Sequence, residues 1–419
     1  MFDLDRWQEI WITITRNKMR SILTAFGVFW GIFMLVVMSG AGFGLENGVN
    51  SEVEGFAQNS AYFFGDLTSE PYKGFRKGRS WHMRNEDMGI LTANIPEIRY
   101  ISPVLFGGKG DNNTAYGDKY GSYNIKGFNP MYNFIEPQEM VYGRYLNEVD
   151  INDRRKVCII GKKVYDEMFQ PGENPLGKLL KINGIYYQVI GVNEPTTQVN
   201  VGGNARESII LPYTVMQQTY NRGDALDCIA VTAEDQIRIG DLEEKITSLL
   251  KAKHSIAPTD QRAIQSVNVE KQFRMFNMLF LGIRSLIWIV GLGTLLAGVV
   301  GVSNIMLVTV RERTKEIGIR RALGAKPAAI LVQIMNESLV LTAIAGFFGL
   351  ALGVGLLSIV DNAMTIAAGG EPTFFKHPQL PFNTAIMASV VLLISGMMAG
   401  IIPAWRALQI KAIDALRDE

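Results

Sequence analysis

The sequence predicts an α-helical membrane protein with four transmembrane helices and a large extracytoplasmic α+β domain inserted between helices 1 and 2. Composition is the first reason: 48% of the 419 residues are hydrophobic and the mean hydropathy is +0.12, which is high for a soluble protein. The second reason is the distribution of charge. Four runs without Asp, Glu, Lys or Arg each exceed the ~20 residues that cross a bilayer. They are Ser21–Leu45, Ser285–Val310, Ser338–Val360 and Pro378–Trp405.

These runs divide the chain into segments. We expect transmembrane helices at 21–45, 285–310, 327–360 and 380–405, the third with an amphipathic lead-in. The connecting segments are a cytoplasmic or interfacial amphipathic helix at 1–20, an external domain with helical ends at 46–284, a cytoplasmic helix at 311–326, an external loop at 361–379 and a cytoplasmic tail at 406–419.

Basic residues predict the orientation, because short cytoplasmic loops are enriched in Lys and Arg. Segments 1–20 and 311–326 are rich in both residues, whereas loop 361–379 contains only Lys376. We therefore expect both termini in the cytoplasm and 46–284 outside. Segment 1–20 also has an apolar stripe that suits a helix in the headgroup region. The stripe consists of Leu4, Trp7, Trp11 and Ile14.

The composition also argues against several function classes. A net charge of +1 gives no reason to expect a nucleic-acid partner. The histidines His82, His254 and His377 lie far apart, and no His, Cys or carboxylate cluster has metal-ligand spacing. We therefore expect no metal site and no catalytic site. Cys158 and Cys228 each lie in an apolar run that resembles a strand, and we interpret them as buried free thiols.

The stretch GENPLGKLL has the spacing of a phosphate-binding loop, through Gly172, Gly177 and Lys178. Such a loop requires Ser or Thr at the next position, where Leu179 stands, and it should follow a strand and begin a helix. Here a helical pattern precedes it and a strand pattern follows. We interpret the stretch as a turn that leads into a β-hairpin.

The external segment alternates short strand patterns with helical ones, which predicts an α+β sheet domain of two lobes. We expect the lobe boundaries near 135–142 and 196–206. The stretch PYKGFRKGRSWHMR, residues 71–84, mixes basic and aromatic side chains. We interpret it as a solvated loop, and contact with an anionic lipid or a partner is the alternative.

The two ends of the external segment have apolar residues at helical spacing. They are Leu45, Val49, Val53 and Phe56 at one end and Phe273, Phe276 and Phe280 at the other. Steps of three and four residues are typical of helices that pack along a narrow seam. We expect the first two membrane helices to continue outward as a stalk, and the alternative is a pair of ordinary amphipathic surface helices.

The loop RERTKEIGIRRALGAK predicts a short cytoplasmic helix of mixed charge, with Gly324 as its C-terminal cap. An apolar facet that the short loop does not obviously cover makes it a candidate docking site for another protein. Positive-inside anchoring is the alternative. Glu337, near the start of the third span, is expected to pack against this basic loop. Three glycines of that span, Gly346, Gly349 and Gly353, predict close helix packing, either within the chain or between two copies.

Three stretches resemble the permeases of the MacB/FtsX superfamily of ABC transporters: RNKMRSILTAFGVFWG, RERTKEIGIRRALGA and the terminal ALRDE, although Ile413 stands where the family often has Pro. The resemblance implies that the external domain consists of the family's porter and sabre subdomains. It also implies that 311–325 is the coupling helix, which contacts the ATP-binding subunit. Its expected contact residues are Arg311, Glu312, Arg313, Glu316, Ile317, Gly318, Arg320, Arg321, Leu323 and Gly324.

The resemblance further implies a permease subunit that works by mechanotransmission in the bacterial inner membrane and exports a substrate such as an antibiotic or a peptide. The expected partners are a separate ATP-binding subunit, a second permease copy or a paralogue, a periplasmic adaptor and an outer-membrane channel. ATP and Mg²⁺ would bind to the separate subunit, so this chain is expected to be no enzyme and to hold no cofactor. Two alternatives are a signalling permease that acts on a periplasmic partner and a lipoprotein-releasing permease.

Overall fold

The computed structural model describes residues 18–53, 56–107, 112–195, 201–368 and 375–409. Contacts divide the chain into two compact units. We call residues 1–50 and 278–419 the helical unit and residues 51–277 the sheet unit. The apolar stripe predicted for segment 1–20 and Ile413 of the tail lie outside the described residues.

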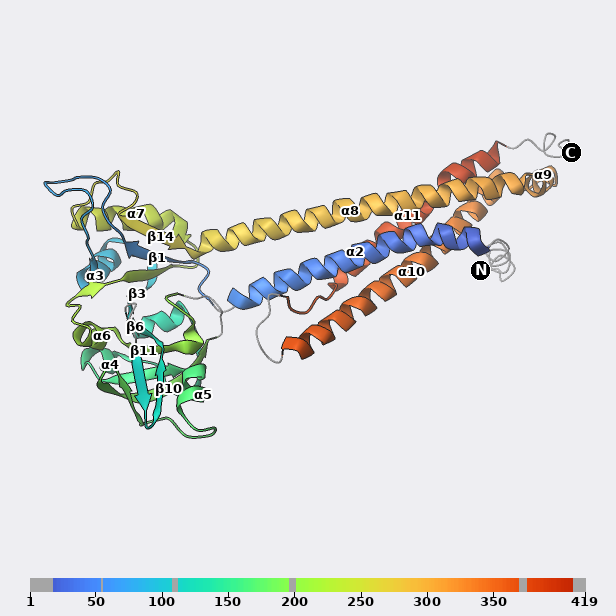
Figure 1. Ribbon diagram of the computed structural model, residues 1–419. Coiled ribbons are helices and arrows are strands. Elements are labelled where there is room, and N and C mark those ends of the chain that lie inside the picture. Colours follow the sequence, from blue (N-terminus) through green and yellow to red (C-terminus); the bar gives the residue numbers. More distant parts are fainter. Residues whose placement is uncertain (1–17, 54–55, 108–111, 196–200, 369–374, 410–419) are drawn as a thin grey trace. The chain divides into compact units, whose positions relative to one another are not determined.

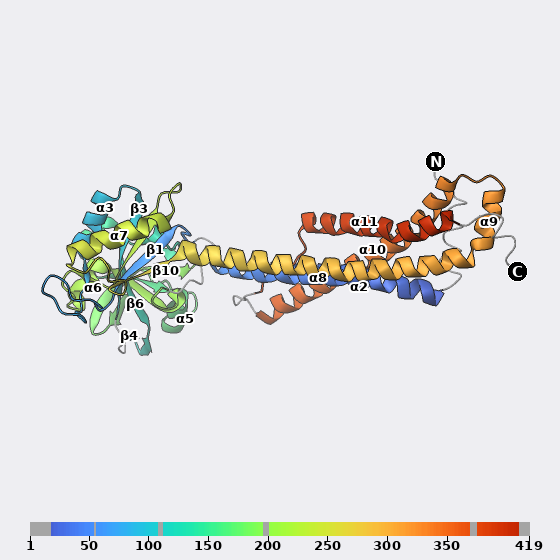
Figure 2. The ribbon, with the colours of Figure 1, turned by 90° about the horizontal axis from the view of Figure 1, so that it is seen from above.

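Four helices are long and apolar enough to cross a membrane by length and composition. They are α2 (Lys18–Val53), α8 (Val269–Glu312), α10 (Pro327–Ala368) and α11 (Phe382–Leu408), and the short helix α9 (Thr314–Ala322) follows α8 (Figures 1 and 2). The sheet unit is inserted between the first and the second of the four. This arrangement confirms the predicted fold class.

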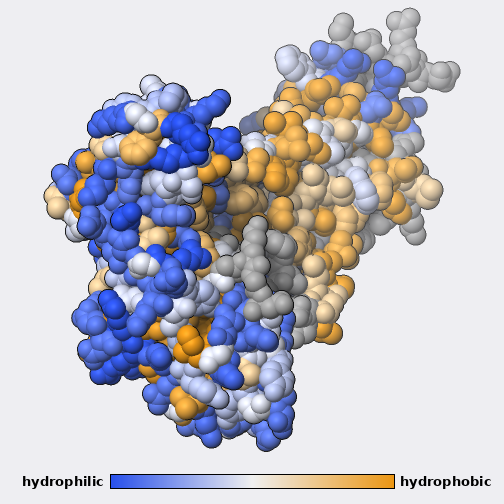
Figure 3. Space-filling model, turned by 60° about the vertical axis from the view of Figure 1, so that its left-hand side comes forward, coloured by the Kyte–Doolittle hydropathy of each residue, from blue (hydrophilic) through white to orange (hydrophobic). Residues whose placement is uncertain are grey.

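The surface of the helical unit is apolar, as expected for helices that face lipid. In Figure 3 the hydrophobic colour covers the helices of this unit, whereas the sheet unit taken by itself is mostly hydrophilic on the face shown. Large outward side chains of the membrane helices include Ile289, Val300, Phe347 and Ile359.

The helices of this unit pack closely through glycines. A Cβ atom added to Gly27 of α2 would lie only 3.2 Å from Cα of Gly298 in α8, and one added to Gly31 would lie 3.1 Å from Cα of Leu295. Side chains at these positions would force the two helices apart. Small residues at helix interfaces serve this purpose in membranes, where van der Waals contact drives association.

The three glycines predicted to allow close packing lie on α10. A Cβ atom added to Gly349 would lie 2.7 Å from the carbonyl oxygen of Phe29 in α2, and Gly353 meets the same helix further along. Gly346 instead lies against the side chain of Leu392 in α11. All three glycines therefore lie against helices of the same chain.

The sheet unit contains one 12-stranded sheet and one two-stranded sheet. Its strands are β1 (Ser60–Gly65), β2 (Met83–Arg84), β3 (Ile98–Phe106), β4 (Asn113–Tyr116), β5 (Lys119–Ser122), β6 (Asn124–Phe128), β7 (Gln138–Gly143), β8 (Val157–Gly161), β9 (Leu179–Ile182), β10 (Ile185–Pro195), β11 (Ser208–Pro212), β12 (Ala225–Leu226), β13 (Cys228–Ala233) and β14 (Ile264–Asn268). Its helices are α3 (Asn85–Asn94), α4 (Glu148–Asn152), α5 (Lys162–Met168), α6 (Tyr213–Thr219) and α7 (Ile239–Lys253), with 3₁₀ turns at Pro130–Phe134 and Ala205–Glu207.

The large sheet is mixed. Its strand order is β14-β1-β13-β3-β6-β11-β8-β10-β9-β4-β5, and β7 pairs with β10. The pairs β8–β10 and β6–β11 are parallel, whereas β1 pairs antiparallel with both β13 and β14. Four strands of the sheet, β14, β1, β13 and β3, therefore come from the two ends of the unit, and the eight strands between 113 and 212 form the rest.

Each face of the sheet has its own hydrophobic core, because successive side chains of a strand point to opposite faces. In β1, Ala61 and Phe63 belong to the core that helices α3, α5, α6 and α7 cover. Tyr62 points to the other core, which also contains Phe56 and Val269 from the two ends of the unit.

The structure confirms two interpretations of the sequence. The stretch GENPLGKLL leads from α5 into the hairpin of β9 and β10, which a turn at Asn183 and Gly184 closes. Both turn residues have positive φ, 47° and 88°, as the tight turn of a two-residue hairpin requires. Cys158 and Cys228 are buried free thiols.

An ion pair between a half-exposed arginine and a buried carboxylate stabilises the start of α4. Asp150 is fully buried and accepts two hydrogen bonds from the guanidinium of Arg144, at 2.6 and 3.0 Å, and one from the backbone N–H of Asn147 at 3.1 Å. Burial alone raises the pKa of Asp150, but these hydrogen bonds outweigh it and leave the pKa lowered. The carboxylate is therefore the stable form in the folded protein.

We predict that Asp150→Asn lowers the free energy of unfolding by about 1–3 kcal/mol at pH 7, because Arg144 then faces a neutral amide. A lowered folded-state pKa contributes stability above the unfolded-state pKa, and this stability is lost as the pH falls through the folded-state pKa. The difference from the wild type should therefore shrink below about pH 4. Thermal unfolding of the full chain in detergent at pH 7 and pH 3 measures both effects.

The control for this experiment is Asp153→Asn, which removes the exposed pair of Asp153 with Arg155. We expect this control to change the free energy of unfolding by less than about 0.5 kcal/mol. A difference between Asp150→Asn and the wild type that is the same at both pH values would contradict the assignment.

Candidate functional site

Helix α9 is a separate short helix between α8 and α10 (Figure 2). It begins after Arg313, whose φ and ψ of −98° and 12° interrupt the helical path. It ends before Gly324, which has a φ of +91°, a conformation that costs a glycine little. Pro327 then opens α10, where its missing N–H is no loss. The local sequence therefore fixes both ends of α9.

The inner side of α9 packs into the helical unit. Ile317 and Gly318 are buried, and Ile317 lies in the same core as Val310 of α8 and Ile330 and Ile334 of α10. The predicted apolar facet is therefore divided, because Leu323 points outward and is 83% exposed.

Polar contacts hold α9 and its ends to two further helices. Arg313 pairs with Glu337 of α10 at 3.3 Å, and Glu337 is only 5% exposed. Arg320 donates to Gln333 of α10 at 3.0 Å. Arg321 donates to the carbonyl oxygen of Leu408, the last residue of α11, at 2.9 Å. The expected packing of Glu337 against the basic loop is confirmed.

The predicted contact residues thus form two groups. Those that attach α9 to the rest of the unit are Arg313, Ile317, Gly318, Arg320 and Arg321. Those whose side chains or backbone face outward are Arg311, Glu312, Glu316, Leu323 and Gly324. Gln333 and the Leu408 carbonyl were not anticipated, since neither an amide within a membrane helix nor a backbone acceptor has a sequence signature.

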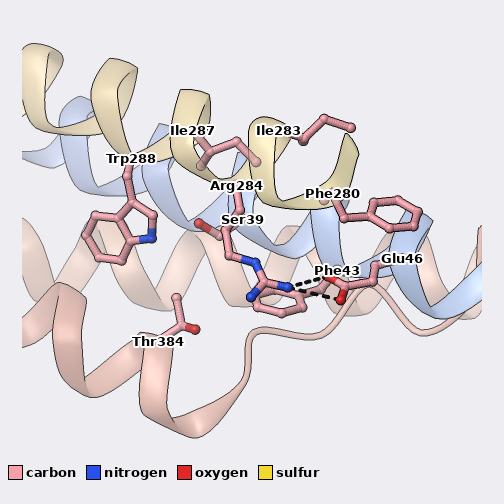
Figure 4. A pocket seen from close by; sticks show the side chains of 10 residues that line it. Ser39, Phe43, Glu46, Phe280, Ile283, Arg284, Ile287, Trp288 and Thr384 are labelled. Atoms are coloured by element: carbon pink, nitrogen blue, oxygen red, sulfur yellow. Dashed lines mark hydrogen bonds and ion pairs between the residues drawn. The ribbon is translucent and has the colours of Figure 1, made fainter. Parts of the chain in front are cut away.

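A second ion pair joins α2 and α8 at the ends of their charge-free runs (Figure 4). Arg284 donates to both carboxylate oxygens of Glu46, at 2.7 and 3.0 Å, and its guanidinium lies 5.2 Å from the ring centre of Phe43. Phe280 and Ile287 are buried beside it. These residues line a pocket that also includes Trp288 and Thr384. We call the pair of Arg284 and Glu46 the outer clasp.

The predicted stalk residues lie in different surroundings. Phe280 is buried at the outer clasp, within the helical unit. Phe56 and Phe273 belong to one core of the sheet unit. Leu45 and Phe276 are exposed, Val49 is half-buried, and the side chain of Val53 lies outside the described residues.

Among the described residues, no group of three or more His, Cys, Asp or Glu side chains is arranged to hold a metal ion. The polar contacts instead link helices, at both ends of α8. Such contacts give an external force on α9 a route to the helices beside it.

Two protein-family profiles match the chain. The MacB-like periplasmic core domain matches residues 21–249, and the FtsX-like permease C-terminal domain matches residues 288–412.

Curated relatives match nearly the whole chain. A pyoverdine export ATP-binding/permease protein, PvdT, from Pseudomonas putida is 30% identical over 418 residues, covering 99% of this chain and 59% of the relative. A macrolide export ATP-binding/permease protein, MacB, from Bdellovibrio bacteriovorus is 26% identical over 416 residues, covering 97% of this chain and 60% of the relative. The chain thus spans about 60% of the length of these relatives.

Two solved structures are similar at lower sequence identity. The periplasmic region of MacB from Actinobacillus actinomycetemcomitans is 20% identical with a TM-score of 0.43, covering 54% of this chain and 95% of that one. The extracellular domain of the transporter YknZ from Gram-positive bacteria is 19% identical with a TM-score of 0.41, covering 50% of this chain and 100% of that one.

The first profile spans most of α2 and most of the sheet unit, and it alone covers more than half of the chain. The second spans the part of α8 from residue 288 onward together with α9, α10 and α11. The resemblance drawn from the sequence is therefore confirmed. The chain belongs to the MacB-like periplasmic core domain family and, with its FtsX-like C-terminal domain, is a multi-pass ABC-type permease with a periplasmic core domain.

Proposed function

We propose that this chain is the permease subunit of an exporter that works by mechanotransmission. A separate ATP-binding subunit docks on the outward side of α9 in the cytoplasm, and its ATP-driven closure moves the membrane helices and the periplasmic domain. One observation carries the proposal: α9 is attached to α10 and α11 by Arg313, Arg320 and Arg321, yet it leaves Leu323 83% exposed. A large apolar side chain on a rigid charged helix suits a protein interface better than water.

The names of the relatives support the ATP-driven part of the proposal. Both are called export ATP-binding/permease proteins, so in them the two activities belong to one protein. In the proposed assembly ATP and Mg²⁺ bind to the ATP-binding subunit and not to this chain. We further propose a second permease copy, a periplasmic adaptor and an outer-membrane channel as partners.

The same comparison supports a proposal for the substrate class. The relatives export pyoverdine and macrolides by name, and we propose a substrate of this kind, an antibiotic, a peptide or a similar molecule. The four charge-free runs offer no charged path through the bilayer, and Glu337 lies directly before the third of them. A substrate taken up on the periplasmic side needs no such path. Export is favoured over the signalling and lipoprotein-releasing alternatives by the names of the relatives.

Force has a continuous route in the helical unit. Movement of α9 reaches α10 through Arg313 and Glu337 and reaches α8 through the core around Ile317. Helix α8 has 44 residues and no proline, and the outer clasp joins it to α2. A helix of this length extends about 66 Å, which exceeds the thickness of a bilayer.

We predict that Leu323→Glu weakens docking of the ATP-binding subunit and leaves the permease folded, because the side chain contacts the partner and little of its own chain. The tagged permease is purified from native membranes in mild detergent, and the ATPase activity of the eluate is measured. We expect a loss of about 10-fold, which equals 1.4 kcal/mol of binding free energy.

The matched control is Leu179→Glu, the same change at an exposed leucine of the periplasmic domain. It should retain the ATPase activity. Equal activity for Leu323→Glu and the control would contradict the docking role of α9.

We predict that Glu46→Arg and Arg284→Glu each impair export, because each leaves two like charges facing each other at the outer clasp. The double exchange restores the opposite charges and should recover most of the activity. Survival of cells on an exported antibiotic measures export, and membrane levels of the chain control for folding. A double variant as impaired as the single ones would contradict the role of the pair.

We predict the orientation of the chain from the basic loops, and thiol labelling tests it. Cys158 and Cys228 are buried, so the native chain should give little background. A cysteine introduced at Tyr120, which is 74% exposed in the sheet unit, should react with an impermeant maleimide applied from the periplasm. A cysteine introduced at Lys315 should react only after the inner membrane is broken, and the opposite pattern would overturn the orientation.

A further inference from the structure

A long loop between β1 and α3 concentrates positive charge on the sheet unit. We call Asp66–Arg84 the distal loop; in Figure 1 it is the dark blue trace beside α3 and α7. Its basic residues are Lys73, Arg76, Lys77, Arg79 and Arg84.

Two of these five cations have hydrogen-bonded or ionic partners, and the Lys73 ammonium lies 5.5 Å from the ring centre of Tyr72. Arg79 donates to the carbonyl oxygens of His254 and Ser255, at 2.6 and 3.2 Å, and Arg84 pairs with Asp224 at 3.6 Å. The other three, Lys73, Arg76 and Lys77, are exposed, and none has a carboxylate partner within the described part of the chain. No carboxylate of the described chain therefore neutralises these three charges.

The distal loop is nevertheless firmly built. The buried carboxylate of Asp260 accepts hydrogen bonds from the backbone N–H of Ser69 at 2.7 Å, from its hydroxyl at 2.7 Å and from the backbone N–H of Glu70 at 3.2 Å. The indole N–H of Trp81 donates to the carbonyl oxygen of Ala263 at 3.1 Å. Both attachments lead to the connection that precedes β14, so the loop has a fixed base.

The tip of the loop is a tight two-residue turn. Tyr72 and Phe75 exchange backbone hydrogen bonds of 3.1 and 2.9 Å across Lys73 and Gly74. The φ angles of Lys73 and Gly74 are 45° and 85°, a pattern for which Asn-Gly is the preferred sequence. A lysine in this conformation costs about 1–2 kcal/mol, so the fold holds a cation at the tip against a local preference.

An aromatic side chain lies among these charges. Phe75 is 47% exposed, and the Arg79 guanidinium carbon lies over its ring, 4.1 Å from the ring centre. An exposed aromatic residue that is already ordered, with cations around it, has the composition of an interface anchor.

The topology of the sheet unit places the loop away from the membrane connections. Strand β1 starts at Ser60, shortly after α2, and its partner β14 ends at Asn268, directly before α8. Ala61 lies opposite Asn268, whereas Gly65 lies opposite Ile264. The distal loop therefore leaves β1 at the other end of these strands, about 13–17 Å along them from the ends that lead to α2 and α8.

We propose that the distal loop is a docking site for a periplasmic protein that presents clustered carboxylates. Lys73, Arg76 and Lys77 steer and orient such a partner, and Phe75 enters an apolar hollow on its surface. The position of the loop within the sheet unit, opposite the two membrane connections, favours a protein partner over the lipid headgroups of the membrane that the chain spans.

Photo-crosslinking in living cells tests the proposal with the full chain. Phe75 is replaced by p-benzoylphenylalanine, which preserves an aromatic ring and reacts with whatever lies against it. Adducts are normalised to the amount of chain in the membrane, and the crosslinked peptide is sequenced. We expect one discrete protein adduct whose crosslinked segment is rich in Asp and Glu.

Charge reversal decides whether the contact depends on the three cations. The test variant adds Lys73→Glu, Arg76→Glu and Lys77→Glu, and we expect the adduct to fall about 10-fold. The matched control adds Lys156→Glu, Lys178→Glu and Lys181→Glu, which makes the same change of net charge at exposed lysines elsewhere in the sheet unit and should leave the adduct within about 2-fold of the parent. Thermal unfolding verifies that both variants are folded.

Four outcomes would overturn the proposal. They are no adduct at position 75, an adduct formed only with lipid or lipopolysaccharide, an adduct on a segment without clustered carboxylates, and an adduct that the test and control variants reduce equally.

Discussion

The ion pair between Arg313 and Glu337 is the constraint on which the α9 end of the helical unit depends. A carboxylate within a membrane helix is costly unless a cation accompanies it. Glu337 is almost fully buried, and the cation that reaches it lies at the break between α8 and α9. The chain must therefore turn back toward α10 as soon as α8 ends, and this return brings Ile317 into the core and leaves Leu323 outside.

The outer clasp likewise pairs two opposite charges, nearer the other end of α8. Glu46 directly follows the first charge-free run, and Arg284 directly precedes the second. Both residues would therefore lie at the edge of the hydrocarbon layer. Pairing them neutralises both charges, and it also fixes the register of α2 against α8. The same register brings Gly27 opposite Gly298, where the two backbones touch. Electrostatics at the edge and close packing inside thus select one alignment of the two helices.

The sequence predicted the membrane helices and the stop of α9 at Gly324 well, because each depends on local chemistry. The start of α9 was predicted at 311, but α8 continues to Glu312 and α9 begins at Thr314. Absence of charge marks a span wherever it occurs, and Gly324 can end a helix without help from distant residues. The orientation of α9 could not be predicted, because it depends on Arg313 meeting a residue of the next helix. Ile317 and Leu323 lie six residues apart, on different sides of a helix, and the sequence alone does not tell which side is buried.

The sheet unit shows the same limit on a larger scale. Its short strands were visible as apolar runs, but their order depends on pairings such as Ala61 with Asn268 that no local pattern encodes. The basic loop at 71–84 was visible too, whereas its fixed base was not. That base comes from Asp260, a residue almost two hundred positions away in the sequence, whose hydrogen bonds convert a stretch interpreted as solvated into an ordered loop.

Helix α8 links the contacts around α9 to the outer clasp, and this link is the structural basis of the proposed mechanism. At one end the core around Ile317 and the break at Arg313 join α8 to α9 and α10, and at the other the outer clasp joins it to α2. The chain also passes from β14 into α8 with no residue between them. Helix α11, in contrast, contains Pro403 in its interior, where a backbone hydrogen bond is missing. Under the proposed function, α8 is therefore the helix that must carry movement, and α11 is the one that can bend to accommodate it.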